Sequence, residues 1–149
     1  SSTKIRDALF DGDLATANAY LGYPYFFSGT VIKGNQMGRT IGFATANIAM
    51  EDEYKLTPAN GVYAVTVQHN ADLYKGMMNI GIRSTINGSD RVTEVHIFDF
   101  DKEIYGDKLR INMYANIRNE IKFSGLEALK EQLKKDKETA LSLLKEVRL

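Results

Sequence analysis

The feature that most constrains the fold is an alternation of apolar and polar side chains between residues 109 and 118. The apolar set takes the odd positions and the other set the even ones: Leu109, Ile111, Met113, Ala115 and Ile117 alternate with Arg110, Asn112, Tyr114, Asn116 and Arg118. Successive side chains of a strand point to opposite faces, so a period of two predicts a half-buried β-strand.

Further strands are expected earlier in the chain. Residues 61–67 are β-branched and aromatic, and residues 29–33, 77–82 and 93–100 form similar runs. Asn87-Gly88 is a turn signal between two of these runs. Helical patterns occur only at the two ends of the chain. This order predicts an α+β, mainly β fold with an antiparallel barrel or sandwich, and disfavours βαβ units.

The ends of the chain should be helical. Asp13 can cap a short helix with Leu14, Ala17 and Leu21 on one face, which we expect to pack on the rest of the chain. The C-terminal pattern has two apolar sets, Leu126, Leu129 and Leu133, then Ala140, Leu144 and Val147. Asp136 stands between the sets, where it is expected to cap a second helix.

Composition excludes several classes of protein. The 149 residues fit one domain, and 19 basic against 19 acidic residues give no net charge to attract nucleic acid or an anionic membrane. There is no cysteine, no long apolar run and no signal peptide pattern, so we expect a cytoplasmic protein. Because the chain opens at Ser1 and not at Met, we also expect it to be a piece of a longer protein.

A glycine-rich segment, residues 34–47, is the first candidate site. Its glycines, Gly34, Gly38 and Gly42, would let backbone N–H groups approach phosphate oxygens, and Arg39 could clamp an anion. Thr45 and Asn47 carry oxygens that suit a hard cation. The spacing is not that of a P-loop, and an ordinary hairpin loop would also use glycine. Both interpretations stay open on these residues alone.

Glu94 and His96 form the second candidate site, because residues two apart on a strand share a face. Phe98 and Phe100 are expected on that face too, and a carboxylate beside aromatic rings can have a raised pKa and act as a base. A surface glutamate beside a structural histidine is the alternative. The sequence contains neither H-E-x-x-H nor G-x-S-x-G, which disfavours zinc hydrolases and acyl-transfer serine enzymes.

Several segments together resemble the riboflavin kinase family. The first is G-T-V-x-x-G-x-x-x-G-R-x-x-G-F-A-T-A-N from Gly29 to Asn47. It is followed in the family's order by G-V-Y at 61–63, M-N-I-G at 78–81, E-V-H-I-F-D-F at 94–100, I-Y-G at 104–106 and I-R-N-E-I-K-F at 117–123. The resemblance covers residues 23–149. Residues 1–22 are similar to the tail of the adenylyltransferase module of bifunctional riboflavin kinase/FAD synthetases.

The resemblance implies a Greek-key β-barrel of about six strands that makes FMN from riboflavin and ATP. It implies that Gly34, Gly38, Arg39 and Gly42 cover the phosphates of ATP, that Thr45 and Asn47 bind Mg²⁺, and that Glu94 is the catalytic base. Arg118, Asn119 and Glu120 would lie near the flavin. An adenylyltransferase module is expected as a partner in the full-length chain, with neither nucleic acid nor membrane as partner.

Two positions depart from the family pattern. Ala44 and Ser84 stand where the family usually has proline, and a missing proline loosens an unbound loop. A non-catalytic flavin-binding module is the competing function, although it would not need Thr45, Asn47 and Glu94 together. An oligonucleotide-binding barrel is a third possibility, which zero net charge disfavours.

Overall fold

Six antiparallel strands close into a barrel in the order β1-β2-β5-β4-β3-β6, with β6 pairing back to β1. The computed structural model describes residues 2–33, 39, 41–51 and 57–149, without the side chains of residues 84 and 85. The strands are β1 (Tyr25–Ile32), β2 (Ala46–Met50), β3 (Gly61–His69), β4 (Asp72–Thr85), β5 (Gly88–Ile97) and β6 (Lys108–Arg118).

The connections confirm the expected Greek key. Strands β3, β4 and β5 follow one another as hairpins, and β6 then returns to pair with β3. This 6-3-4-5 neighbour order is the Greek-key arrangement. The turn at Asn87-Gly88 joins β4 to β5 as the sequence predicted.

The barrel interior is filled by one face of each strand. On β3, β5 and β6 the residues concerned are fully or almost fully buried and apolar: Tyr63, Val65, Val67, Val95, Ile97, Leu109, Ile111 and Met113. Burial of this continuous apolar face is what closes the sheet on itself, because the hydrophobic contribution scales with the apolar area removed from water.

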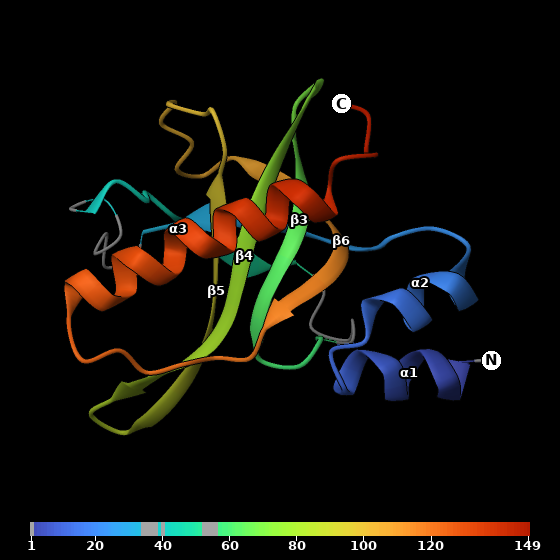
Figure 1. The fold of residues 1–149 in the computed structure, drawn as a ribbon, viewed down its shortest axis with the longest axis horizontal. Helices are drawn as coiled ribbons and strands as arrows, with labels where there is room; N and C mark the ends of the chain where they lie inside the picture. Colours follow the sequence, from blue (N-terminus) through green and yellow to red (C-terminus); the bar gives the residue numbers. More distant parts are fainter. Residues whose placement is uncertain (1, 34–38, 40, 52–56) are drawn as a thin grey trace.

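Helices α1 (Ser2–Phe10) and α2 (Leu14–Leu21) pack on the barrel and extend its core (Figure 1). Leu14 and Ala17 are buried, which confirms the expected face of α2. Asp13 caps α2 by accepting a hydrogen bond from the backbone N–H of Thr16. Asn18 ties the helix to the barrel, because its amide donates to the Met113 carbonyl at 2.9 Å.

Helix α3 (Leu126–Leu143) lies across the outer face of β3, β4 and β6 (Figure 1). It is one unbroken helix, so the expectation that Asp136 caps a second helix is wrong. Ala140 and Leu144 pack with Ala64 and Met77 in a second apolar cluster outside the barrel. None of the helices in the described part of the chain is long and apolar enough to cross a membrane.

Strand β6 keeps its predicted alternation only as far as Met113. The pairing of β6 with β3 shifts register twice beyond this residue, so that Ala115 faces Ala64 and Arg118 faces Val62. Each shift of one residue reverses the side of the sheet that a side chain faces. Ile117 therefore packs in the outer cluster and not inside the barrel as the alternation predicted.

Candidate active site

A row of five side chains crosses the outer face of the barrel. Residues directly opposite one another on paired strands share a face, and the pairs connect in series: Asn47 of β2, Glu94 of β5, Asn79 of β4, Val62 of β3 and Arg118 of β6. On β5 the neighbouring Val95 points into the core. The period of two therefore brings the polar members of the row together, although they come from distant parts of the sequence.

A first cavity of about 220 Å³ opens between this row and α3. Its floor includes Glu94 and Asn79, and its apolar walls include Phe43, Met77 and Leu133. The segment between β6 and α3 supplies Glu120, Ile121 and Phe123 as a further wall. Mostly apolar walls with a few polar groups are typical of sites for small organic ligands.

A second cavity of about 340 Å³ lies at the barrel end beyond β2. The segment after β5 contributes residues 100–105 to its lining, and Arg39 lines it as well. Thr45 lines both cavities. A group held at Thr45 therefore stands where the contents of the two cavities can meet.

Glu94 has the electrostatic setting of a base. Burial raises the pKa of its carboxyl above the ordinary 4.5, while the positive charge of Arg83 opposes the shift. A raised pKa makes a carboxylate a stronger proton acceptor once it is ionised. Asn47 and Asn79 flank Glu94 on the neighbouring strands and provide polar neighbours on both sides.

His96 connects β5 with the segment that carries Thr45. Its Nδ1 donates a hydrogen bond to the Ala44 carbonyl at 2.7 Å, and its ring contacts those of Phe43 and Phe98. Burial lowers the pKa of His96 below 6.5, with the positive charge of Lys137 acting in the same direction and the Ala44 hydrogen bond opposing it. The neutral ring therefore braces the residue before Thr45.

Phe98 lies near His96 as expected, but Phe100 does not. Phe100 packs against the barrel-core cluster, where its ring meets those of Tyr74 and His69 edge-on. Strand β5 ends at Ile97, and Asp99 has a positive φ of 54°. The alternation on which the prediction relied is broken at that point.

The glycine-rich segment is described only in part. Gly34 and Gly38 lie outside the described residues. Gly42 has a φ of 86°, a conformation that glycine adopts without strain, and its N–H donates to the Arg39 carbonyl. Arg39 lines the second cavity, as an anion-binding residue would need to. The side chain of Ser84, one of the two departures from the family pattern, also lies outside the described part of the chain.

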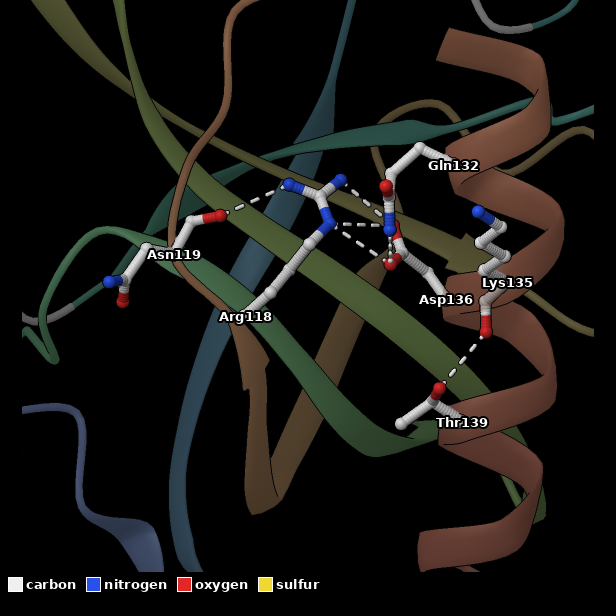
Figure 2. Close-up of polar contacts among 6 residues, drawn as sticks. All are labelled: Arg118, Asn119, Gln132, Lys135, Asp136 and Thr139. Atoms are coloured by element: carbon white, nitrogen blue, oxygen red, sulfur yellow. Dashed lines mark hydrogen bonds and ion pairs between the residues drawn. The ribbon is translucent and has the colours of Figure 1, made fainter. Parts of the chain in front are cut away.

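The first cavity is lined by only two of the three described residues expected near the flavin, which were Arg118, Asn119 and Glu120. Arg118 and Glu120 line the first cavity, and Glu120 lies over Gly81, where a Cβ would overlap its carboxylate. Asn119 is not among the described residues that line the cavity. In Figure 2 its backbone carbonyl faces Arg118, and its side chain points away.

The oxygen donors that could hold a divalent cation are a hydroxyl and an amide. No group of three or more histidine, cysteine, aspartate or glutamate residues gathers within the described ranges. Thr45 immediately precedes β2 and lines the first cavity with Glu94, and Asn47 of β2 lies opposite Glu94. The oxygens of both side chains are hard ligands. Mg²⁺ is commonly bound through a few protein oxygens with the rest from phosphate and water, so this donor set fits a metal–nucleotide.

Sequence reasoning missed one residue of the site and one residue that is paired with it. Asn79 occurs in a motif of the resemblance, but only its pairing with Glu94 reveals its place. Asp136 was expected to be a cap, yet it is buried and paired with Arg118. A signal was present, because Leu133, Asp136, Ala140 and Leu144 follow the spacing of one helical stripe. A charge on a buried stripe needs a partner of opposite charge.

A family model described as riboflavin kinase matches residues 21–144. Two curated relatives, from Bacillus subtilis and Haemophilus influenzae, are both named bifunctional riboflavin kinase/FMN adenylyltransferase. The first is 44% identical over 99% of this chain and 48% of its own length. The second is 48% identical over 94% of this chain and 45% of its own length. The chain thus spans about half the length of the curated relatives it matches.

Solved structures give the same fold. One, described as a macrolide-efflux protein from Streptococcus pneumoniae, has a TM-score of 0.88 and 40% identity over 94% of this chain and 46% of that one. Another, riboflavin kinase from Trypanosoma brucei, has a TM-score of 0.59 and 25% identity over 84% of this chain and 82% of that one. The efflux description stands apart, whereas the family model, both relatives and the second structure agree on a kinase.

Proposed function

Because the chain belongs to the riboflavin kinase family, we propose that it transfers the γ-phosphoryl group of ATP to the terminal ribityl hydroxyl of riboflavin. The products are FMN and ADP. The observation that carries the proposal is the position of Thr45, which lines both cavities, with Glu94 in the first. Two substrates held in adjoining cavities can react where the cavities meet.

The first cavity suits the flavin and the second the nucleotide. Phe43, Met77 and Leu133 give the first cavity apolar walls for an aromatic ring system, and the carboxylate of Glu94 in its lining suits a hydroxylated tail. The second cavity has two cationic residues in its lining, Arg39 and Lys102, which could contact a polyphosphate. Its lining also includes the acidic Asp101 and Glu103, so the case for the nucleotide rests on the position of Arg39 in the glycine-rich segment and not on the net charge of the cavity.

Glu94 accepts the proton of the attacking hydroxyl. The ribityl oxygen forms a bond to the γ-phosphorus, the bond from that phosphorus to the β–γ bridging oxygen breaks, and ADP leaves. The hydroxyl proton passes to the Glu94 carboxylate, whose raised pKa favours its acceptance. Catalysis of this kind depends mainly on positioning and charge stabilisation.

Thr45 and Asn47 would hold Mg²⁺ through their side-chain oxygens. When bound, the ion offsets negative charge on the phosphates. His96 contributes indirectly, because its hydrogen bond to the Ala44 carbonyl fixes the residue before Thr45. Arg118 and Glu120 are proposed to contact the flavin from the wall of the first cavity.

The whole protein is proposed to carry a second activity. The relatives from Bacillus subtilis and Haemophilus influenzae are named as bifunctional with FMN adenylyltransferase, and this chain covers under half of each. We propose that residues 1–22 adjoin such a module and that residues 23–149 are the kinase. The chain alone is then expected to make FMN and no FAD. A cytoplasmic location stays a prediction.

The test is to mix the chain with riboflavin, ATP and Mg²⁺ and to separate the flavins by chromatography. FMN should accumulate with ADP in equal amounts, and excess EDTA should stop its formation. Binding of riboflavin without FMN would instead support the non-catalytic flavin-binding module. FAD formed from FMN and ATP would contradict the proposed boundary between the two activities.

A further inference from the structure

Asp136 is a buried charge outside the residues assigned to the reaction. It is 1% exposed in the middle of α3. Its carboxylate accepts hydrogen bonds from Arg118 Nε at 2.9 and 3.0 Å, from Arg118 Nη2 at 2.8 Å and from Gln132 Nε2 at 3.0 Å (Figure 2). A buried carboxylate is tolerated only when it is paired in this way, so Asp136 and Arg118 form a unit.

The other side of Arg118 faces the first cavity. Its Nη1 donates to the Asn119 carbonyl at 3.1 Å, and its guanidinium carbon lies 5.6 Å from the centre of the Phe123 ring. Arg118 and Phe123 both line the cavity, whereas Asp136 is not among the described lining residues. One guanidinium thus connects β6, the segment after it and α3.

We propose that Asp136 is a positioning residue for the flavin cavity, acting through Arg118. Asp136 fixes the direction of the guanidinium, and the guanidinium in turn fixes the start of the segment that carries Glu120 and Phe123. This inference rests on the proposed function and assigns it a further determinant. The consequence is that the affinity for riboflavin depends on Asp136, while the affinity for ATP does not.

A purely structural role for Asp136 would change different measurements. Helix α3 also packs through Ala140 and through its C-cap Leu144, which are both fully buried, so its attachment does not depend on the ion pair alone. Buried ion pairs often add little net stability compared with apolar residues of similar size. Loosening of α3 as a whole would affect protein stability first, and it would not change the affinity for riboflavin selectively over the affinity for ATP.

The experiment compares Asp136→Asn and Asp136→Glu with Glu138→Gln, an exposed acidic residue of the same helix. Riboflavin affinity is measured by flavin fluorescence on binding and by KM, alongside KM for ATP and kcat. Asp136→Asn should weaken the affinity for riboflavin about tenfold, which is the factor expected from losing one charge-assisted hydrogen bond. ATP KM and kcat should stay within about threefold, since only binding of one substrate is affected. Glu138→Gln should match the parent.

A double-mutant cycle tests whether the effect passes through Arg118. In an Arg118→Met background, Asp136→Asn should change riboflavin affinity by less than about twofold. Thermal melting establishes that each variant is folded. If Asp136→Asn does not fold, Asp136→Glu, which keeps the charge but displaces it, carries the test and should give a smaller loss.

Unchanged riboflavin affinity in a folded Asp136 variant would overturn the inference. So would equal weakening of riboflavin and ATP, or a full effect of Asp136→Asn in the Arg118→Met background. The fluorescence measurement separates this inference from the proposed function. A parent chain that binds riboflavin but forms no FMN would refute the kinase reaction, and the binding comparison would still decide on Asp136. A parent that does neither would overturn both.

Discussion

On β5, Val95 and Ile97 point into the barrel, whereas Glu94 and His96 point to the outer surface beneath α3. The inner face is mainly apolar and packs as one continuous core. The outer face combines an apolar cluster with the polar row that includes Asn47 and Glu94. Alternate residues of the same strands therefore form the core and the site of the proposed reaction, and effects on stability and on turnover should be separable by mutation.

The largest expected effect is on the outer face, from Glu94→Gln. Turnover should fall about 10²–10⁴-fold, because the amide cannot accept the hydroxyl proton. The fold should survive, since Glu94 lies outside the barrel core. FMN formation under saturating substrates measures the loss, with the exposed Glu146→Gln as control. A Glu94→Gln variant as fast as the parent would remove Glu94 from the role of base.

On the inner face, Ile80→Ala should lower the stability of the fold and leave turnover unchanged. Ile80 is 1% exposed and lies next to Asn79 of the polar row. Removing its side chain leaves a cavity, which should lower the free energy of unfolding by about 2–5 kcal/mol. Urea denaturation measures this loss. The folded fraction should keep the parent's kcat, and a drop comparable to that of Glu94→Gln would show that the two faces are coupled.

The inner face was also the more predictable one. Leu109, Ile111 and Met113 alternate as the sequence indicated, and the expected Greek-key barrel is present. Local periodicity reports one strand's own burial, so it needs no knowledge of the partners. After Met113 the same periodicity failed, because the register shifts against β3 depend on a strand about 50 residues away.

Predicting the outer face required knowledge of contacts that the sequence does not display. Glu94 and Thr45 could be named as candidates from their motifs. Their shared position beside two cavities results from the pairing of β2 with β5 and from the path of residues 100–105. The pairing of Asp136 with Arg118 spans a loop and a helix, and only the packing of α3 on the barrel brings them together.

A smaller effect is expected at Gly81, where the outer face carries a cavity-wall residue. A Cβ there would overlap the carboxylate of Glu120, which is the far end of an exposed, flexible side chain and can swing away. Gly81→Ala should therefore raise KM for riboflavin a few-fold, which corresponds to about 1 kcal/mol or less of binding free energy. The melting temperature should change little.

Gly76→Ala is the matched control on the same strand. Its Cβ would lie 2.7 Å from the His96 carbonyl oxygen, which belongs to the backbone and cannot move aside freely. This variant should lose stability, about 1–3 kcal/mol, as overpacked sites do. If Gly81→Ala were the more destabilised of the two in thermal melts, the side chain of Glu120 would not be free to move aside.

The smallest expected effect is the dependence of stability on pH, which Glu94 and His96 influence in opposite directions. The raised pKa of Glu94 means that the folded state holds its proton more tightly than the unfolded state. The resulting stabilisation is fully present below pH 4.5 and is lost as pH rises through the raised value. The lowered pKa of His96 means that stability is lost as pH falls below 6.5.

The two contributions overlap in mildly acidic solution, so the parent alone cannot resolve them. Subtracting the parent's melting temperature from that of Glu94→Gln removes the His96 contribution, which both proteins share. The difference should increase as pH rises from about 4.5 and level off above the raised pKa, with Glu94→Gln the more stable protein there, because it no longer buries a charge. A difference that stayed constant with pH would mean that burial does not shift Glu94, and the case for Glu94 as a tuned base on the outer face would fail.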